Sequence, residues 1–471
     1  MVKTGDKKTL TVALLIGLGL AAGALSQHRT AAEALIVLTG FAIFGASGLW
    51  LQKEIGIFKL NRLTIPGWLY LSYMLMIFFP ALGIFSTQTG IYRYYYIGSV
   101  QLTAIAFSFG IMATNRLLSS SAAETEAFYK RDLSIKEPPG LRTGFMILLA
   151  ASLALTVVYL LEVKAAPLLY LLKGGRSIES LMIMREHSFK LLNSRLIYLF
   201  SWLRGTIYPL LILIAGGSYY VFKDKWWLIR FIATILPGLF YIALSTEKAP
   251  VAAVFVMMLF LLYLIRKGRV PLAWTGALVA LAMIFPLAVI KVVAPGATVD
   301  LFQYVFNRVF SVPAFTLYYY FEIFPAKVGF LWGASIGKLA PLFGLRQFEL
   351  TNYVFKYMYN GIESGSANAA FIGDLWANFG VIGVVAGSFL VAALFQAIHI
   401  MLIRKEKNIL TLAVYAWFIY LTWMLASTSI FVVILSHGLI VALLIHAALN
   451  RTGKRDLDVA LETGERIATD G

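Results

Sequence analysis

The chain has 471 residues, of which 60% are hydrophobic and only 13% are charged, and its mean hydropathy is +0.80. Soluble domains carry about 25% charged residues, so this composition excludes an ordinary soluble protein and indicates one that is embedded in lipid. The sequence contains no cysteine, which excludes disulfides, thiolate metal sites and cysteine nucleophiles.

Apolar runs that could cross a bilayer recur about twelve times, given that each crossing needs about 20 residues. Each run should be a helix, because backbone groups without hydrogen bonds are too costly in lipid. The sequence therefore predicts an all-α polytopic integral membrane protein, with one transmembrane domain over residues 1–450 and a polar cytoplasmic tail over 451–471. The expected spans are 9–26, 32–50, 66–88, 97–115, 142–161, 196–217, 226–245, 250–265, 271–290, 371–402, 408–425 and 429–449.

Some of these spans should be distorted. The run 371–402 exceeds the length of one crossing, so part of it should tilt or project from the membrane. Gly380, within that run, is typical of close helix packing. Proline occurs inside predicted spans at Pro209, Pro237 and Pro286, where kinked helices are expected.

The formal charge of +17 follows from membrane topology rather than from binding to nucleic acid. Lysine and arginine collect in cytoplasmic loops, and with the N-terminus inside, every inner segment of the predicted topology carries such a cluster. This pattern places both termini in the cytoplasm. The inner cations are Lys53, Lys59, Arg62, Lys130, Arg131, Lys136, Arg266, Lys267, Arg269, Arg404, Lys405, Lys407, Arg451, Lys454 and Arg455.

Two sizeable polar loops, 163–195 and 292–370, face outward in this topology. Within the first, residues 178–192 mix apolar and charged positions at helical spacing, which predicts an interfacial helix. The second is too long to lack structure, so it should contain short helices packed at the membrane surface. Its many tyrosines and phenylalanines are also typical of an interfacial aromatic belt.

Arginines on the outer side are the first candidates for function, because positive charge in short translocated loops is disfavoured. Guanidinium groups bind phosphate oxygens in bidentate fashion, which predicts a clamp for an anionic, lipid-linked substrate. For any single arginine, the alternative is contact with lipid headgroups or pairing with Glu179 or Glu186. The candidate arginines are Arg176, Arg185, Arg195, Arg204 and Arg308.

Ionisable side chains at the membrane edge add further candidates. Glu247 and Lys248 share a short turn between two spans, where such groups are functional by default, so Lys248 is a candidate for substrate binding. The alternative is an ion pair between these two residues. Glu363 and Asp374 are candidate general bases towards a sugar hydroxyl, if burial raises their pKa. Helix capping is the alternative for Asp374.

Other catalytic signatures are missing from the sequence. It contains no phosphate-binding loop, no HExxH and no GxSxG motif, and its five histidines are dispersed. We therefore expect no cofactor and no metal ion, although Asp374 and Glu363 leave a divalent cation open as an alternative.

Several short stretches occur in an order that resembles one family. They are Asn307 to Ala314, Phe321 to Pro325, Gly333 to Ser335, Glu363 to Ala367 and Leu375 to Gly383, with the turn from Ser245 to Lys248. Together they resemble the bacterial oligosaccharide repeat-unit polymerases, the Wzy-type O-antigen polymerases. The resemblance implies a GT-C-like glycosyltransferase of the bacterial inner membrane. Such an enzyme moves a growing glycan from undecaprenyl pyrophosphate onto another lipid-linked repeat unit at the periplasmic or outer face.

The resemblance also implies roles and partners. Arg176, Arg185 and Arg308 would bind pyrophosphate, and Glu363 or Asp374 would lie near the acceptor hydroxyl. The partners would be the undecaprenyl-pyrophosphate-linked oligosaccharide and the bilayer, with a polysaccharide chain-length regulator as a further candidate. The alternatives are an O-antigen ligase or another GT-C enzyme, and a transporter or flippase of lipid-linked oligosaccharide. No pair of similar halves is evident, which argues against the transporter.

Overall fold

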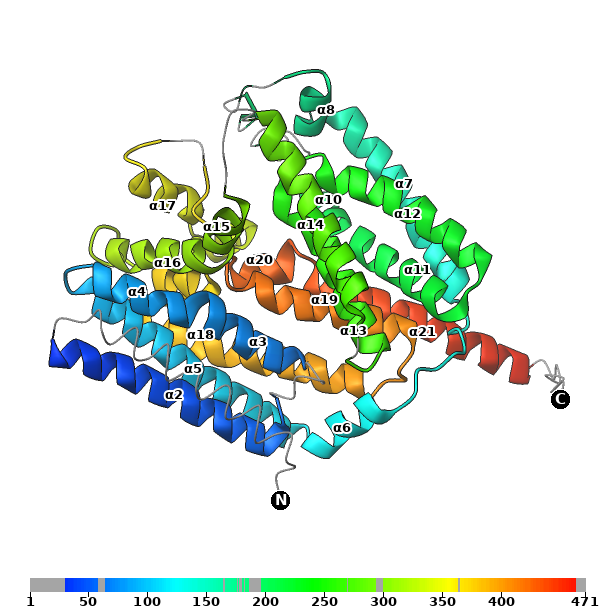
Figure 1. Ribbon diagram of the computed structural model, residues 1–471, viewed down its shortest axis with the longest axis horizontal. Coiled ribbons are helices and arrows are strands. Elements are labelled where there is room, and N and C mark those ends of the chain that lie inside the picture. Colours follow the sequence, from blue (N-terminus) through cyan, green and yellow to red (C-terminus); the bar gives the residue numbers. More distant parts are fainter. Residues whose placement is uncertain are drawn as a thin grey trace. The chain divides into compact units, whose positions relative to one another are not determined.

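The computed structural model describes residues 30–57, 64–163, 166–175, 177, 180–181, 183–185, 196–268, 270–293, 300–362 and 365–462 (Figure 1). Regular structure in these residues is entirely helical, without a strand. Ten of the described helices are long and apolar enough to cross a membrane. The chain is therefore an all-helical, multi-pass membrane protein, as its composition indicates.

The ten candidate spans correspond to ten of the expected ones. The expected span 408–425 is a shorter apolar helix, Ile409–Met424. The expected span 9–26 lies outside the described residues. Residues 300–362 are largely helical: three helical segments run without a break over 301–323, and two short helices, Gly337–Phe343 and Leu350–Met358, follow.

One compact unit comprises Met1–Ala127, Val299–Ile403 and Leu421–Ile430. Its centre is the long contact between α18 and α5, with α2 and α3 packed around this pair (Figure 1). Gly110 allows the two central helices to approach, because a Cβ there would lie 2.3 Å from the carbonyl oxygen of Phe389. The helices are α2 (Ala31–Ile55), α3 (Ile65–Tyr73), η1 (Met74–Phe78), α4 (Phe79–Thr87), α5 (Tyr92–Leu117), α15 (Leu301–Phe306), η3 (Asn307–Ser311), α16 (Val312–Ile323), η4 (Gly337–Phe343), α17 (Leu350–Met358) and α18 (Phe371–Ile403), followed by α6 (Ala122–Lys130) at the unit's edge.

The second unit comprises Phe128–Thr298, Arg404–Tyr420 and Phe431–Gly471. Here α11 packs against α12, α13 against α14, and α21 against α7. The last helix continues to Glu462, well into the segment expected to be a polar tail. The helices are α7 (Leu141–Glu162), α8 (Pro167–Leu172), α10 (Ile197–Trp202), η2 (Leu203–Ile207), α11 (Tyr208–Phe222), α12 (Lys225–Ala243), α13 (Lys248–Ile265), α14 (Leu272–Val293), α19 (Ile409–Met424), α20 (Ile430–Leu435) and α21 (Leu439–Glu462).

The long helix α18 is broken at Gly380, whose φ of 62° and ψ of −147° are not helical. This backbone conformation favours glycine, because a side chain there would be strained. A neighbouring segment pairs with the helix beside the break: Leu331 N–H donates to Ala377 O at 3.0 Å, and Trp332 N–H donates to Asn378 O at 3.1 Å. The expected role of Gly380 was close helix packing, whereas the structure shows that it interrupts the helix. The apolar run is unusually long because it contains two helical parts joined at this break.

In the described part of the chain, three helices contain a π turn, and each π turn begins the same number of residues before a proline. The π turns η1, η2 and η3 begin six residues before Pro80, Pro209 and Pro313, respectively. Proline lacks an N–H and clashes with the carbonyl oxygen four residues earlier, so the preceding turn widens. Pro209 therefore produces a widened turn, while Pro237 and Pro286 lie inside α12 and α14.

Just before α19, a lysine is buried. Lys407 is only 2% exposed, and its Nζ donates hydrogen bonds to the carbonyl oxygens of Tyr129 (3.2 Å) and Arg131 (2.8 Å). Burial lowers the pKa of Lys407 to about 8, and the nearby charge of Lys267 adds to this shift. The protein therefore carries an ammonium group whose charge is costly to bury.

This lysine should make stability depend on pH. Because folding lowers its pKa from 10.5 to about 8, the unfolded chain binds more protons between these two values, and stability should rise with pH across that window. The rise should amount to ~1–3 kcal/mol. Thermal unfolding in detergent between pH 7.5 and 10 would measure it, with Lys407→Met as the comparison. Equal pH dependence in both proteins would contradict this assignment.

Candidate functional site

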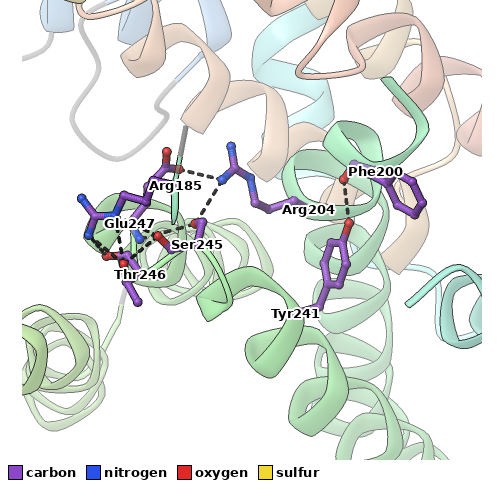
Figure 2. A network of polar contacts seen from close by, with 7 residues as sticks. All are labelled: Arg185, Phe200, Arg204, Tyr241, Ser245, Thr246 and Glu247. Carbon is purple, nitrogen blue, oxygen red and sulfur yellow. Dashed lines mark hydrogen bonds and ion pairs between the residues drawn. The ribbon is translucent and has the colours of Figure 1, made fainter. Parts of the chain in front are cut away.

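An arginine lies within a candidate membrane span. Arg204 belongs to the π turn η2, about 10 Å along the helix axis from Ile197, at 1.5 Å per residue. Its Nη1 donates a hydrogen bond to Ser245 Oγ at 3.2 Å and forms an ion pair with Glu247 Oε2 at 2.7 Å (Figure 2). Ionisable side chains at such positions are rare and usually functional.

A second arginine reaches the same turn from a different segment. Arg185 Nε donates to the carbonyl oxygen of Ser245 at 3.0 Å and to Thr246 Oγ1 at 2.9 Å. Its Nη2 donates to the carbonyl oxygen and to Oγ1 of Thr246, both at 2.8 Å (Figure 2). Burial lowers the pKa of Arg185, and the charge of Glu247 opposes this shift. Two guanidinium groups therefore converge on the turn between α12 and α13.

The turn itself has an uncommon backbone. Thr246 is fully buried and has a φ of 54°, which a residue with a branched side chain rarely adopts. A conformation of this kind costs about 1–3 kcal/mol and persists only when its surroundings impose it. The four hydrogen bonds from Arg185 supply that constraint, so Arg185 fixes the turn that Arg204 also contacts.

The π turn that carries Arg204 is held by groups from α19, from α20 and from the turn that follows α20. Since Pro209 has no N–H to offer the carbonyl oxygen of Gly205, that oxygen instead accepts a hydrogen bond from Trp417 Nε1 at 3.0 Å. Thr206 Oγ1 donates to His437 O, and Trp202 Nε1 donates to Leu435 O. These hydrogen bonds hold in place the helix turn that carries Arg204.

A small recess lies beside Arg204, with about 10 Å³ of space open to a water-sized molecule. Its other lining residues are Tyr159, Ile197, Phe200, Ser201, Tyr241 and Ser245. The ring of Tyr159 packs edge-on against Phe200 and Tyr241, with centroids 5.3 and 5.1 Å away. Ligand sites commonly combine apolar walls with a few polar groups in this way.

Asp374 occupies a different environment, in the first turn of α18. Its Oδ1 accepts hydrogen bonds from Ser335 Oγ at 2.7 Å and Asn378 Nδ2 at 3.1 Å, and its Oδ2 accepts one from Ser429 Oγ. Asn378 in turn accepts a bond from Gly333 N–H at 2.9 Å. The carboxylate is buried. This geometry ties three segments together and favours a structural part for Asp374, because the three bonds use most of the carboxylate's four acceptor positions.

Of the remaining sequence candidates, Lys248 adjoins the same turn, at the start of α13, and Arg308 lies on a different helix. Arg308 lies on the π turn η3 with an exposed side chain and forms no hydrogen bond or ion pair within the described residues. Lys248 is half-buried at the first position of α13, and its neighbour Glu247 forms an ion pair with Arg204. Glu363, Arg176 and Arg195 lie outside the described residues, as does most of the expected interfacial helix 178–192.

Sequence reasoning missed two groups of residues. Ser245 and Thr246 appeared only within the turn that carries the resemblance, and no sequence signal shows that their backbone and hydroxyl oxygens bond to the two arginines. The second group is Glu322, Lys327 and Tyr357, which hydrogen-bond to one another. The sequence does place Glu322 seven and three residues after Phe315 and Tyr319, and this helical spacing predicts that the three side chains share one face of a helix.

No protein-family model matches this chain, and neither a curated protein nor a solved structure resembles it significantly. In the part of the chain that the structure describes, no three histidine or acidic side chains gather in a way that would hold a metal ion.

Proposed function

We propose that this protein is a membrane glycosyltransferase that polymerises undecaprenyl-pyrophosphate-linked oligosaccharide repeat units. The reaction would take place at the outer face of a bacterial inner membrane, during synthesis of O-antigen, capsule or exopolysaccharide. The observation that carries the proposal is the convergence of Arg185 and Arg204 on one turn beside an aromatic recess. Both arginines and the turn fall on the outer side in the topology that the lysine and arginine distribution predicts.

The chemistry of the substrate matches this arrangement. A polyprenyl pyrophosphate has an anionic head that guanidinium groups bind well, and its apolar tail would remain in the bilayer that the neighbouring apolar helices are suited to cross. Arg204 would contact the phosphate oxygens, and Arg185 would hold the turn in place. The ion pair between Arg204 and Glu247 would open when phosphate replaces the carboxylate.

In the proposed reaction, the hydroxyl of an acceptor sugar attacks the anomeric carbon of the donor glycan. The bond from that carbon to the pyrophosphate oxygen breaks, and undecaprenyl pyrophosphate leaves with the electron pair. Arginine would stabilise the negative charge that develops on the leaving group. Glu363 stays a candidate to accept the hydroxyl proton, while the contacts of Asp374 favour a positioning role.

Two alternatives use similar sites. A ligase would pass the finished glycan to a different acceptor, and it needs the same pyrophosphate contacts. A flippase would bind the lipid-linked oligosaccharide without breaking a bond. The fixed support of Arg204 favours an enzyme, because a preorganised charge stabilises a transition state best when it does not move.

We expect Arg308→Ala to shorten the polysaccharide, because an exposed arginine in the outer segment is suited to bind a second lipid pyrophosphate. A deletion strain would be complemented with wild type, Arg308→Ala or Arg346→Ala, and the surface polysaccharide would be separated on a gel. Arg346 is the matched control, an exposed arginine in the same predicted loop.

The deletion strain itself distinguishes the candidate functions. Loss of the long ladder, with single repeat units still attached to their final acceptor, supports the polymerase. Loss of all attached repeats, with polymer accumulating on undecaprenyl pyrophosphate, identifies a ligase. Loss of all repeats, with lipid-linked units trapped on the inner leaflet, identifies a flippase.

A further inference from the structure

One face of α16 is left uncovered in its compact unit. Phe315, Tyr319 and Glu322 follow one another at spacings of four and three residues, so they share a face of the helix. Phe315 is 39% exposed, and the other two are half-buried. The opposite face is buried, with Leu317, Tyr320 and Phe321 in the core. The exposed face therefore consists of two rings and a carboxylate.

A tyrosine from α17 completes this surface. Tyr357 Oη donates a hydrogen bond to Glu322 Oε1 at 2.6 Å, and its ring meets that of Tyr319 with centroids 6.2 Å apart. Lys327 Nζ lies 3.4 Å from Glu322 Oε1 and 4.0 Å from the centre of the Tyr357 ring. The turn that carries Lys327 is fixed by its backbone N–H, which donates to Ile323 O at 2.8 Å.

The edge of this surface carries both a hydrogen-bond acceptor and a hydrogen-bond donor. Glu322 Oε2 has no partner in the described part of the chain, so it can accept hydrogen bonds from a ligand. Lys327, 43% exposed, has donors to spare. Burial, with Glu322 close by, raises the pKa of Tyr319, so its hydroxyl remains protonated. Phe315 and Tyr319 pack edge-on with centroids 5.3 Å apart and present ring surface beside these groups.

A sugar ring has the matching chemistry. Its hydroxyl groups both donate and accept hydrogen bonds, and the C–H groups on its flatter side pack against aromatic rings, which combine apolar area with polar edges. A purely structural clasp between α16 and α17 would explain the bond from Tyr357 to Glu322. It would not require the exposed ring of Phe315 or the unpaired oxygen of Glu322 beside it.

We propose that Phe315, Tyr319, Glu322, Lys327 and Tyr357 form a binding site for a neutral sugar ring. The rings of Phe315 and Tyr319 pack against the sugar, Glu322 accepts hydrogen bonds from its hydroxyls, and Lys327 donates to them. Identification of that sugar as part of the lipid-linked repeat unit rests on the proposed function. Sugar binding itself depends only on the surface described here.

Saturation-transfer NMR on the full chain in nanodiscs tests this site, with methyl glycosides of glucose, galactose, mannose, rhamnose and N-acetylglucosamine as probes. We expect transfer to at least one of them, reduced about fivefold to tenfold by Phe315→Ala and by Glu322→Gln, since each loses a contact of about 1 kcal/mol. Tyr353→Phe is the control, because Tyr353 is an exposed aromatic residue of α17 that packs instead on Phe348.

The outcomes separate the two proposals. No transfer to any probe, or equal transfer to wild type and both variants, would overturn the sugar site whatever the enzyme does. Transfer that depends on Phe315 and Glu322 would support the site even if the polysaccharide gel excludes a polymerase. Tyr357→Phe keeps the ring and removes the bond to Glu322, so it should weaken transfer without loss of folding. Thermal unfolding of each variant checks the fold.

Discussion

Replacement of Arg204 by alanine is expected to abolish polymer synthesis, with a loss of about 100- to 1,000-fold, the usual effect of removing one charge-stabilising donor from an active site. Arg204→Lys should restore little, because a lysine ammonium cannot reproduce the planar fork of donors that a guanidinium offers to phosphate. Incorporation of lipid-linked repeat units by the protein in nanodiscs would measure both variants. Binding of undecaprenyl pyrophosphate should weaken in parallel.

The ion pair between Arg204 and Glu247 requires its own control. Arg204→Ala leaves Glu247 without this partner, which could disturb the turn for reasons unrelated to substrate. Glu247→Gln breaks the same pair but keeps the arginine, and it should retain most of the activity. If Arg204→Ala supports normal polymer synthesis, or if both variants fail equally, the anion site is assigned to the wrong residue.

Replacement of Asp374 by alanine is expected to destabilise its compact unit by ~3–5 kcal/mol, since hydrogen bonds to a buried carboxylate are strong and the variant loses three of them at once. Ser335, Asn378 and Ser429 would all lose a partner. The midpoint of thermal unfolding should fall by about 5–10 °C.

Asp300→Ala is the matched control for this experiment. Asp300 caps α15, where its Oδ1 accepts a bond from Gln303 N–H at 3.1 Å on an exposed surface. Loss of such a cap costs about 1 kcal/mol. A variant Asp374→Ala that unfolds at the wild-type temperature but makes no polymer would reverse our interpretation and indicate that Asp374 is a catalytic base.

The membrane spans could be predicted from the sequence because hydropathy and helix length decide them locally. The expected runs 66–88 and 142–161 agree closely with the helices Ile65–Thr87 and Leu141–Glu162. The three π turns each lie a constant distance before a proline, but Pro237 and Pro286 sit in helices without such a turn, so proline alone does not predict one. The break at Gly380 could not be predicted, because it depends on Phe330 to Gly333, which lie beside it only after folding.

The candidate site was predicted only in part. Arg185 and Arg204 were recognised from their positive charge on the predicted outer side, and the structure brings both to one turn. Their partners include backbone and hydroxyl oxygens of Ser245 and Thr246, and no pattern of residues along the chain shows which arginine will reach them. Asp374 was identified as unusual, but its sequence context gave no sign of the three donors that surround it.

The break in α18 also bears on how this protein enters the membrane. The ~23 residues from Val381 to Ile403 suffice by themselves to cross a bilayer, which needs about 20. The insertion machinery receives the whole run of 33 residues as one hydrophobic signal, although the segment before Gly380 finishes in contact with Ser335 and Ser429. Substitutions that make Phe371 to Phe379 more polar should therefore leave insertion intact. Packing and hydrogen bonding in the folded protein, rather than membrane insertion, decide which residues this stretch can carry.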